Sequence, residues 1–320
     1  MKTKVGIIGG AGYTAGELLR LLVNHPSVEV VYVQSASQAG KKVSEVHQDL
    51  IGEIQLEFQL EVKACEINFL CKGHGASKDL LERHPELLDY NVIDLSQDFR
   101  LKGDHSFVYG LPEKNTAHIQ SAHLIANPGC FATSIQLALL PSVKKGVINS
   151  DIHVSGITGS TGAGQSFSTT SHYSWRHGNA SVYKSLNHQH LLEIGETVLS
   201  YDSSFDFHIN FIPYRGAFTR GIITTSYFDT ELTDDDLRDV YNEFYPNAPF
   251  THVVETNPDV KQVVNTNKCL VFPQVINGKA VVVSVIDNLL KGAVGQAVQN
   301  MNLLLGIDEK TGLQLKSTAF

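Results

Sequence analysis

Short apolar runs alternate with amphipathic segments along the first third of the chain. Four runs have the length and composition of buried strands: 5–8, 28–33, 67–70 and 91–95. A helical spacing of apolar residues follows the first run at 17–22 and recurs at 77–84, where Pro85 interrupts it. Strands that alternate with helices form parallel sheets, so this part predicts an α/β fold with a doubly wound parallel sheet.

The apolar run at 131–140 has helical length and spacing, and we expect Pro141 to stop that helix. The pattern changes after Pro141. Alternating apolar residues predict strands in three further places: 152–157, within 206–228 (two runs) and 280–286. A last helix is expected over 287–305. These elements predict a second domain of the α+β class, with no internal repeat and no low-complexity tract.

A glycine-rich segment connects the first strand to the first helix. Its glycines depart from strict Gly-x-Gly-x-x-Gly spacing but suit a related turn, in which backbone amides approach a pyrophosphate at the helix N-terminus. A purely structural turn is the alternative. The candidate cofactor ligands of this segment are Gly9, Gly12, Tyr13, Thr14, Ala15 and Gly16.

The end of the second strand predicts which cofactor binds. A carboxylate there would bind the ribose 2′-hydroxyl of NAD, but the strand ends in Gln34, Ser35, Ala36 and Ser37. Hydroxyls at Ser35 and Ser37, with Lys41 and Lys42 a few residues on, favour a 2′-phosphate and hence NADP(H). The alternative for the two lysines is solvated surface charge.

Cys130 is the candidate nucleophile. Pro128 and Gly129 make a tight turn, and the thiol then stands at the first turn of the predicted helix. Unpaired amides and the helix dipole favour negative charge there, so a cysteine in that place can have a depressed pKa and react as a thiolate. The alternative is a small buried cysteine without a chemical role.

His188 and His190 provide candidate proton donors and acceptors. Two histidines at this spacing could also ligate a metal, but Glu193 is the only close carboxylate and no cysteine lies nearby, so no metal is expected. Neutral imidazole can take a proton from a thiol and later return it. We therefore expect a histidine to act beside the reactive cysteine.

Three other features could bind the cofactor or the substrate. A loop of small residues at 158–164, with Gly159 and Gly162, could hold a phosphate or the nicotinamide end of a cofactor, or could be a flexible connection. Arg215 and Arg220 are candidates for holding anionic substrate groups, with solvated surface arginines as the alternative.

Composition limits the class of protein. The 320 residues are 42% hydrophobic and 18% charged, with a net charge of -8, which argues against non-specific binding of nucleic acid. No apolar stretch is long enough to span a membrane, and Met1 to Lys4 lead directly into a strand, so no signal peptide is expected. Four scattered cysteines fit a reducing cytoplasm.

Over nearly its whole length the chain resembles N-acetyl-gamma-glutamyl-phosphate reductases, the NADPH-dependent enzymes of arginine biosynthesis. Four segments carry the resemblance: Asn127-Pro-Gly-Cys130, Asp94-Leu-Ser-Gln-Asp-Phe-Arg100, Asn187-His-Gln-His190 with Glu193-Ile194, and Asp287-Asn-Leu-Leu-Lys-Gly292 continuing to Gln299-Asn-Met-Asn302. The resemblance implies a semialdehyde-dehydrogenase-like fold. A Rossmann-type NADP domain would take 1–130 with 290–320, and a catalytic and dimerisation domain 131–289.

The resemblance also implies roles for individual residues. Cys130 would be the nucleophile that forms a thioester and His188 the acid/base. The substrate, a small acyl phosphate, would be seated by Arg100, Asn127 and His190, and Ser96 and Asn288 would contact the cofactor. A homodimer or homotetramer is implied as well.

Three positions depart from the family pattern and leave alternatives open. Ala132 replaces a usual proline, Gln165 a usual basic residue, and Tyr214 a frequent histidine. All three could alter the pocket for the acyl group on the substrate nitrogen, so N-succinyl-glutamyl phosphate is an alternative substrate. Two rival functions are an aspartate-semialdehyde-type dehydrogenase and an NADP-binding sensor without catalysis.

Overall fold

The computed structural model describes residues 1–318 and divides into two compact units. The first contains residues 1–128 and 293–314, and the second contains residues 129–292 together with 315–318. Within the described residues, no helix is long and apolar enough to cross a membrane.

The first unit is built on a six-stranded sheet in which every paired strand is parallel, in the order β2-β1-β3-β4-β6-β5. Its strands are β1 Thr3–Ile8, β2 Val28–Gln34, β3 Ile67–Leu70, β4 Asn91–Asp94, β5 Val108–Tyr109 and β6 Leu124–Ala126. Its helices are α1 Tyr13–Leu22, α2 Val43–Val46, α3 Ala76–Arg83, α4 Pro112–Ser121 and α9 Gly295–Leu304.

This parallel sheet confirms the predicted doubly wound fold. The strand β3 is buried at every position, as expected for a sheet covered on both faces. The C-terminal helix α9 packs on α4 and α1, so a segment from the far end of the chain completes the unit. The carboxyl ends of β1 and β2 lie side by side, which brings the glycine-rich turn next to Ser35.

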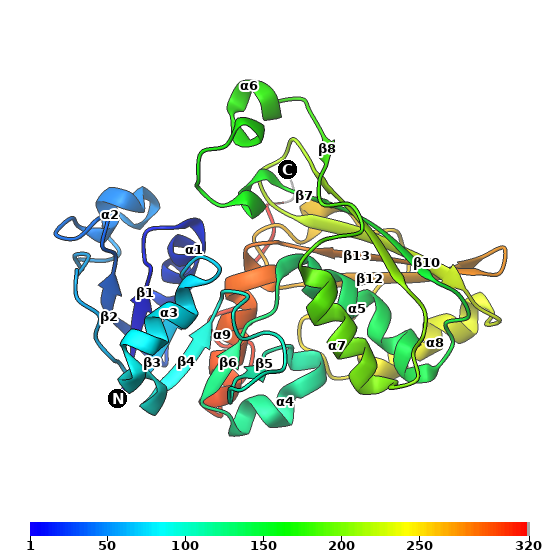
Figure 1. The fold of residues 1–320 in the computed structure, drawn as a ribbon, viewed down its shortest axis with the longest axis horizontal. Helices are drawn as coiled ribbons and strands as arrows, with labels where there is room; N and C mark the ends of the chain where they lie inside the picture. The colour runs from blue at the N-terminus through cyan, green and yellow to red at the C-terminus, as the bar shows by residue number, and fades with distance from the viewer. Residues whose placement is uncertain (319–320) are drawn as a thin grey trace. The chain divides into compact units, whose positions relative to one another are not determined.

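The second unit contains a mixed seven-stranded sheet in the order β11-β12-β13-β10-β7-β9-β8. Its strands are β7 Ile152–Thr158, β8 Ser181–Val182, β9 Ile209–Arg215, β10 Ile222–Asp229, β11 Thr251–Val253, β12 Cys269–Ile276 and β13 Lys279–Ile286. Its helices are α5 Cys130–Lys145, α6 Tyr173–Arg176, α7 His190–Tyr201 and α8 Asp234–Phe244. Figure 1 shows α5, α7 and α8 together on one face of this sheet.

The helix α5 is the centre of the second unit, and it corrects one prediction. Residues 131–143 are all buried, as expected of a helix with neighbours on every side. The prediction that Pro141 stops the helix is wrong, because the helix continues to Lys145. Pro141 cannot donate to the Leu137 carbonyl, and the Tyr245 hydroxyl donates to that oxygen instead, at 2.7 Å. A side chain from outside the helix thus replaces the lost hydrogen bond.

The predicted helix over 287–305 also differs in its first part. A wide π-type turn occupies Leu290–Val294, and regular α-helix begins only at Gly295. Asp287 at the end of β13 accepts the Gly292 N–H through its backbone oxygen at 2.9 Å, which closes this segment into a loop. Such turns are frequent at functional sites.

Candidate active site

In the first unit, the turn between β1 and α1 has the geometry of an anion site. The Gly10 N–H donates to the Gln34 carbonyl at 2.7 Å, which fixes the turn to the end of β2. The first helical bond runs from the Gly16 N–H to the Gly12 carbonyl at 3.0 Å, so the amides of residues 13–15 face out of the helix N-terminus. No atom lies within 4 Å of the position that a Gly12 Cβ would take, which leaves room for a ligand there. The turn therefore fits a pyrophosphate.

The segment after β2 offers hydroxyls in the place of a carboxylate. The Ser35 and Ser37 oxygens lie 3.4 Å apart, with Ser35 buried and Ser37 exposed. Lys41 is exposed and donates to the Gln38 side chain at 3.0 Å. The arrangement has donors for a 2′-phosphate.

His47 is a residue of this region that the sequence analysis did not identify. Its side chain is buried, and its Nε2 lies 2.7 Å from the Gly10 carbonyl oxygen. A carbonyl oxygen only accepts, so Nε2 donates the hydrogen bond. His47 thereby fixes the glycine-rich turn. No spacing in the sequence signals the pair, because 37 positions separate the two residues.

Ser96 belongs to a hydrogen-bonded network. Its hydroxyl donates to Asp94 Oδ2 at 2.7 Å and accepts from the Asp98 N–H at 3.0 Å. Burial raises the pKa of Asp94, and the hydrogen bonds from Ser77 and Ser96 act in the opposite direction. The network orders the loop after β4, and a direct contact between Ser96 and the cofactor stays a prediction.

Arg100 and Asn127 lie together at the end of β6. The Arg100 Nε donates to the Asn127 carbonyl at 2.9 Å, and Asn127 Nδ2 donates to the Ala293 carbonyl at 3.0 Å. Asn300 Nδ2 donates to Asn127 Oδ1 at 3.1 Å. Both predicted substrate ligands thus fix the chain immediately before the Pro128 turn, and their contact with substrate stays a prediction.

In the second unit, Cys130 is the first residue of α5. Gly129 is the N-cap in an extended conformation, and the Thr133 N–H makes the first helical bond to its carbonyl at 2.8 Å. The amides of residues 130–132 therefore face out of the helix N-terminus, beside a half-buried thiol. This position is the one the sequence predicts for the thiol.

Gly129 allows α7 to pack closely against the turn that precedes Cys130. The Gly129 N–H donates to Glu193 Oε2 at 3.1 Å, and a Cβ on Gly129 would lie 2.4 Å from His190 Nε2. His190 Nε2 is 3.9 Å from Glu193 Oε1, and both side chains are buried. The glycine of Asn-Pro-Gly-Cys is thus required by close approach, and His190 lies against the backbone that precedes the thiol.

His188 is a buried, neutral imidazole. Four rings pack edge-on around it: Phe131, Tyr183, His190 and Phe211. Burial, with a smaller effect from Lys184, lowers the pKa of His188 to about 4. Its Nδ1 accepts the His190 N–H at 3.2 Å, so the neutral ring carries its proton on Nε2. Across residues 1–318, no three or more His, Cys, Asp and Glu side chains are grouped to hold a metal ion.

Tyr183 is a second residue that the sequence analysis missed. Burial raises its pKa to about 12, and the charge of Cys130 adds to that rise. Its ring packs edge-on against that of His188, with 5.8 Å between the ring centres. The Arg215 guanidinium lies over the Tyr183 ring, 4.7 Å from its centre. Tyr183 therefore contacts both His188 and Arg215, and Phe131, the residue after Cys130, contacts the His188 ring. Tyr183 stands only five positions before His188, yet no motif distinguishes it from other tyrosines.

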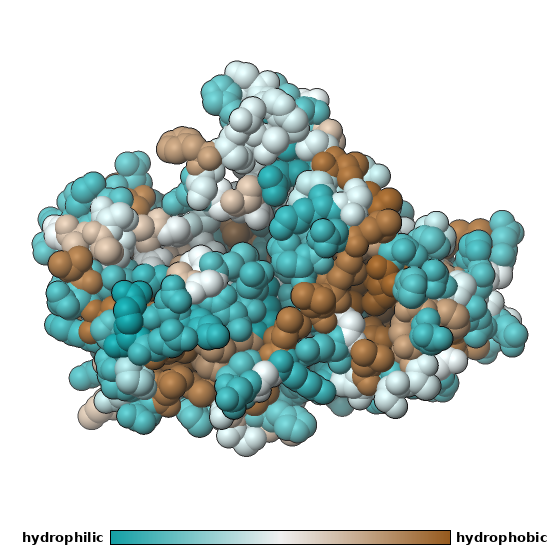
Figure 2. All heavy atoms as spheres, viewed as in Figure 1, coloured by the Kyte–Doolittle hydropathy of each residue, from teal (hydrophilic) through white to brown (hydrophobic). Residues whose placement is uncertain are grey.

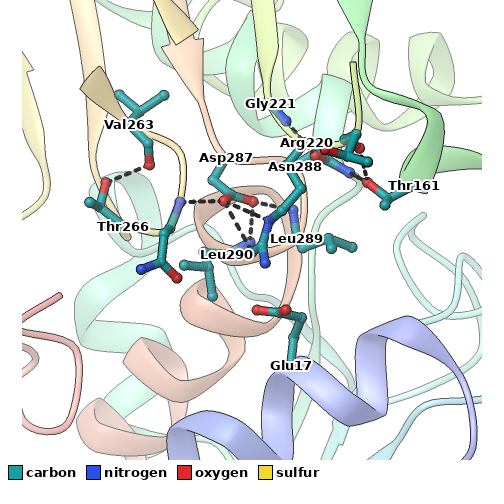
Figure 3. Close-up of polar contacts among 12 residues, drawn as sticks. Glu17, Thr161, Arg220, Gly221, Val263, Thr266, Asp287, Asn288, Leu289 and Leu290 are labelled. Carbon is teal, nitrogen blue, oxygen red and sulfur yellow. Dashed lines mark hydrogen bonds and ion pairs between the residues drawn. The ribbon is translucent and has the colours of Figure 1, made fainter. Parts of the chain in front are cut away.

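Arg220 and Asn288 are held by other parts of the protein (Figure 3). The Arg220 guanidinium pairs with the fully buried Asp287, with Nη2 3.0 Å from Oδ2. Asn288 accepts the Gly221 N–H at 2.7 Å and donates to Thr161 Oγ1 at 3.0 Å. The loop that contains Gly159 and Gly162 is thereby anchored, and its contact with a cofactor stays a prediction.

The three positions that depart from the family pattern lie in different environments. Ala132 is fully buried in the first turn of α5, whereas Gln165 is exposed after the small-residue loop. Tyr214 is half-buried on β9, next to Arg215.

Comparison with known proteins agrees with this architecture. Residues 4–122 match the family described as "Semialdehyde dehydrogenase, NAD binding domain", and residues 130–288 match "Semialdehyde dehydrogenase, dimerisation domain". Among solved structures, aspartate semialdehyde dehydrogenase II from Vibrio cholerae complexed with ASA superposes with a TM-score of 0.76 at 18% identity, covering 96% of this chain and 99% of that one. The Candida albicans aspartate semialdehyde dehydrogenase with NADP gives a TM-score of 0.73 at 14% identity, covering 95% and 99%. These likenesses show the fold.

Much closer sequence relatives exist. The N-acetyl-gamma-glutamyl-phosphate reductase of Parabacteroides distasonis is 52% identical over 320 residues, which cover 99% of each chain. That of Christiangramia forsetii is also 52% identical, with the same coverage. At this identity and coverage, the chain belongs to the N-acetyl-gamma-glutamyl-phosphate reductase family.

Proposed function

We propose that this chain catalyses the NADPH-dependent reduction of N-acetyl-L-glutamyl phosphate to the corresponding semialdehyde, a step of arginine biosynthesis. The observation that carries the proposal is the Cys130 thiol at the N-terminus of α5, where the ring of the next residue, Phe131, packs edge-on against that of His188. Relatives named for this activity are 52% identical over 99% of the chain, which supports the same reaction.

In the proposed reaction the Cys130 thiolate attacks the acyl carbon. A C–S bond forms and the C–O bond to phosphate breaks, so phosphate leaves with the bonding electrons and a thioester remains. The amides at the start of α5 stabilise the oxyanion of the tetrahedral intermediate. NADPH, when bound, supplies the hydride that reduces the thioester carbon. The aldehyde then departs, and one proton restores the thiol.

His188 assists as a neutral ring. Its Nε2–H is available in the tautomer fixed by the His190 N–H, so it suits donation to an oxyanion or to the leaving phosphate. Such assistance contributes roughly 10²–10⁴ in rate. For His188→Asn we expect kcat to decrease by roughly 10²–10⁴-fold, while the pH profile of Cys130 alkylation stays the same. A profile shifted to higher pH would instead identify His188 as the base that takes the thiol proton.

The test of the covalent step is Cys130→Ala. We expect no turnover, with NADPH affinity within about twofold of wild type, because the cofactor turn lies in the other unit. Fluorescence titration with NADPH provides the control. Substantial activity of Cys130→Ala would exclude the thioester.

A second assay decides between this function and the rival dehydrogenase. The reaction is run in reverse, with NADP, phosphate and either N-acetyl-glutamate semialdehyde or aspartate semialdehyde. Equal turnover of aspartate semialdehyde would favour an aspartate-semialdehyde-type dehydrogenase.

The preference for NADP(H) over NAD(H) is supported by Ser35 and Ser37 in the place of a carboxylate. We expect a higher kcat/KM with NADPH than with NADH. Ser35→Asp should reduce or reverse that ratio, because a carboxylate repels a 2′-phosphate and binds a 2′-hydroxyl. An unchanged ratio of kcat/KM values in this variant would show that Ser35 does not contact the 2′-phosphate.

The acyl group on the substrate nitrogen is proposed to be acetyl, with succinyl as the alternative. The names of the relatives support acetyl, whereas the departures at Ala132, Gln165 and Tyr214 support a changed pocket. Kinetics with N-acetyl- and N-succinyl-glutamate semialdehyde decide between them. Equal or better turnover of the succinyl compound would overturn the acetyl assignment.

The second unit is proposed to form a homodimer or homotetramer. The match to a dimerisation domain supports this, as does an apolar band along α7 in Figure 2. Leu192 and Leu199 on α7 are 62% and 48% exposed, and Leu191 and Leu199 line a groove of about 420 Å³. Light scattering should give a dimer or tetramer for wild type and a smaller species for Leu192→Asp combined with Leu199→Asp. Leu60→Asp, which alters a 58% exposed leucine of the other unit, is the matched control.

We also propose a cytoplasmic location. The four cysteines, all among the described residues, form no disulfide, which suits a reducing compartment. Fractionation of the producing cell, followed by immunodetection, tests it.

A further inference from the structure

Asp287 at the end of β13 is a buried carboxylate with five donors. Its Oδ2 accepts from Arg220 Nε at 3.1 Å, Arg220 Nη2 at 3.0 Å and the Asn265 N–H at 2.7 Å. Its Oδ1 accepts the N–H groups of Leu289 and Leu290 at 2.8 and 3.2 Å. Figure 3 shows these bonds converging on the one side chain. The carboxylate therefore fixes both Arg220, which lies just before β10, and the start of the turn that follows β13, residues 287–292.

The far end of the same turn touches the nucleophile. The Gly292 N–H closes the turn on the Asp287 carbonyl at 2.9 Å. A Cβ on Gly292 would lie 2.9 Å from Cys130 Cβ and 3.3 Å from Cys130 Cα. Real side chains do not approach so closely, so the turn rests directly against the carbon that bears the thiol.

A second contact holds the turn 287–292 to the residues just before β10. The residue after Arg220 is Gly221, whose N–H donates to Asn288 Oδ1 at 2.7 Å. Two consecutive residues before β10 thus bind two consecutive residues of the turn, Arg220 to Asp287 and Gly221 to Asn288. The turn has little freedom to move relative to the sheet while the ion pair is intact.

We propose that Arg220 and Asp287 are positioning residues for Cys130: their ion pair fixes the turn 287–292, and Gly292 of that turn sets the place of the thiol. The inference deepens the proposed function, because it rests on Cys130 being the nucleophile. It gives Arg220 a role different from the substrate contact expected from sequence. Arg220 donates through two nitrogens to the buried Asp287, which requires the planar guanidinium, so lysine should replace arginine only in part.

The size of the effect follows from the geometry. A Cβ at position 292 must push the Cys130 carbon away, and a displacement near 1 Å at a reacting group can cost about 100-fold in rate. We expect Gly292→Ala and Arg220→Met to lower kcat by about tenfold to 100-fold, with KM within about threefold. Arg220→Lys should recover part of the loss.

The experiment measures kcat and KM for the acyl phosphate together with the rate of Cys130 alkylation by iodoacetamide. Peptide mass spectrometry separates Cys130 from the other three thiols. Positioning predicts that alkylation slows in step with kcat in Gly292→Ala and Arg220→Met, and that Arg220→Lys lies between these and wild type. The matched control is Arg238→Met, which removes a 3.0 Å Arg238–Asp234 ion pair on α8, and it should behave as wild type.

Two outcomes would overturn the inference. A KM raised more than tenfold in Arg220→Met, with wild-type alkylation, would make Arg220 a substrate ligand. Unchanged or faster alkylation in a folded Gly292→Ala would show that the turn does not position the thiol. Because alkylation needs no turnover, it judges the positioning role even if the acyl phosphate proves to be the wrong substrate. Circular dichroism verifies folding, and Gly292→Ala with Arg220→Lys suffices if Arg220→Met does not fold.

Discussion

Protonating His188 should weaken the second unit at mildly acidic pH. The ring is 5% exposed and packed among aromatic rings, and burial lowers its pKa from 6.5 to about 4. The charged groups near it are Lys184, which opposes its protonation, and the buried pair His190 and Glu193. A proton that the unfolded chain accepts readily is therefore costly in the folded unit.

The sign and size follow from proton linkage. Below about pH 6.5 the unfolded chain binds a proton at His188, while the folded protein binds it only below about pH 4. Unfolding thus takes up a proton in this window, and the free energy of unfolding falls as pH falls from 6.5 towards 4. At about 1.4 kcal/mol per pKa unit, roughly 2 kcal/mol is lost by pH 5 and about 3 kcal/mol below pH 4.

The assay is urea unfolding at pH 8, 7, 6 and 5 for wild type and His188→Asn. The single tryptophan, Trp175, lies in the second unit, so its fluorescence reports on the unfolding of that unit. The substituted asparagine keeps an acceptor for the His190 N–H but cannot titrate. The difference in unfolding free energy between the two proteins should shrink by about 2 kcal/mol from pH 8 to pH 5. A difference constant to about 0.5 kcal/mol would show that His188 is not held neutral by burial.

Two further perturbations test contacts that replace or fix backbone bonds. Tyr245→Phe leaves the Leu137 carbonyl without its 2.7 Å donor, so the free energy of unfolding should fall by about 1–3 kcal/mol in the same urea assay. The control is Tyr227→Phe, which alters a half-exposed tyrosine and should leave the stability unchanged. Equal stability of Tyr245→Phe and wild type would mean that water replaces the phenol as donor. His47→Phe removes the donor to the Gly10 carbonyl, so the dissociation constant of NADPH should rise about tenfold, worth roughly 1.4 kcal/mol, with unchanged Trp175 unfolding. Wild-type affinity in that variant would show that the turn does not depend on His47.

The fold of the first unit was readable because its signals are local. A run such as Ile67–Leu70 is buried at every position, and the apolar spacing around Leu18 to Leu22 is helical, so four of the six strands and the helices α1 and α3 could be placed and the parallel sheet followed. The short strands β5 and β6 carried no such signal and were not predicted. Pro141 shows the limit of local rules. Whether a proline ends a helix depends on which group satisfies the abandoned carbonyl, and Tyr245 lies 108 positions from Leu137.

The candidate site divides in the same way. Sequence by itself determined the glycine-rich turn, the hydroxyls after β2 and a thiol at a helix N-terminus, because each depends on neighbours within a few residues. Only the tertiary structure decided which groups surround that thiol. Arg215, at the end of β9, lies over the ring of Tyr183, which follows β8, and Gly292 reaches Cys130 from 162 positions away. Burial keeps His188 neutral, and the ion pair of Arg220 with Asp287 joins residues 67 positions apart. Both are properties of the packed chain, and no short pattern encodes them.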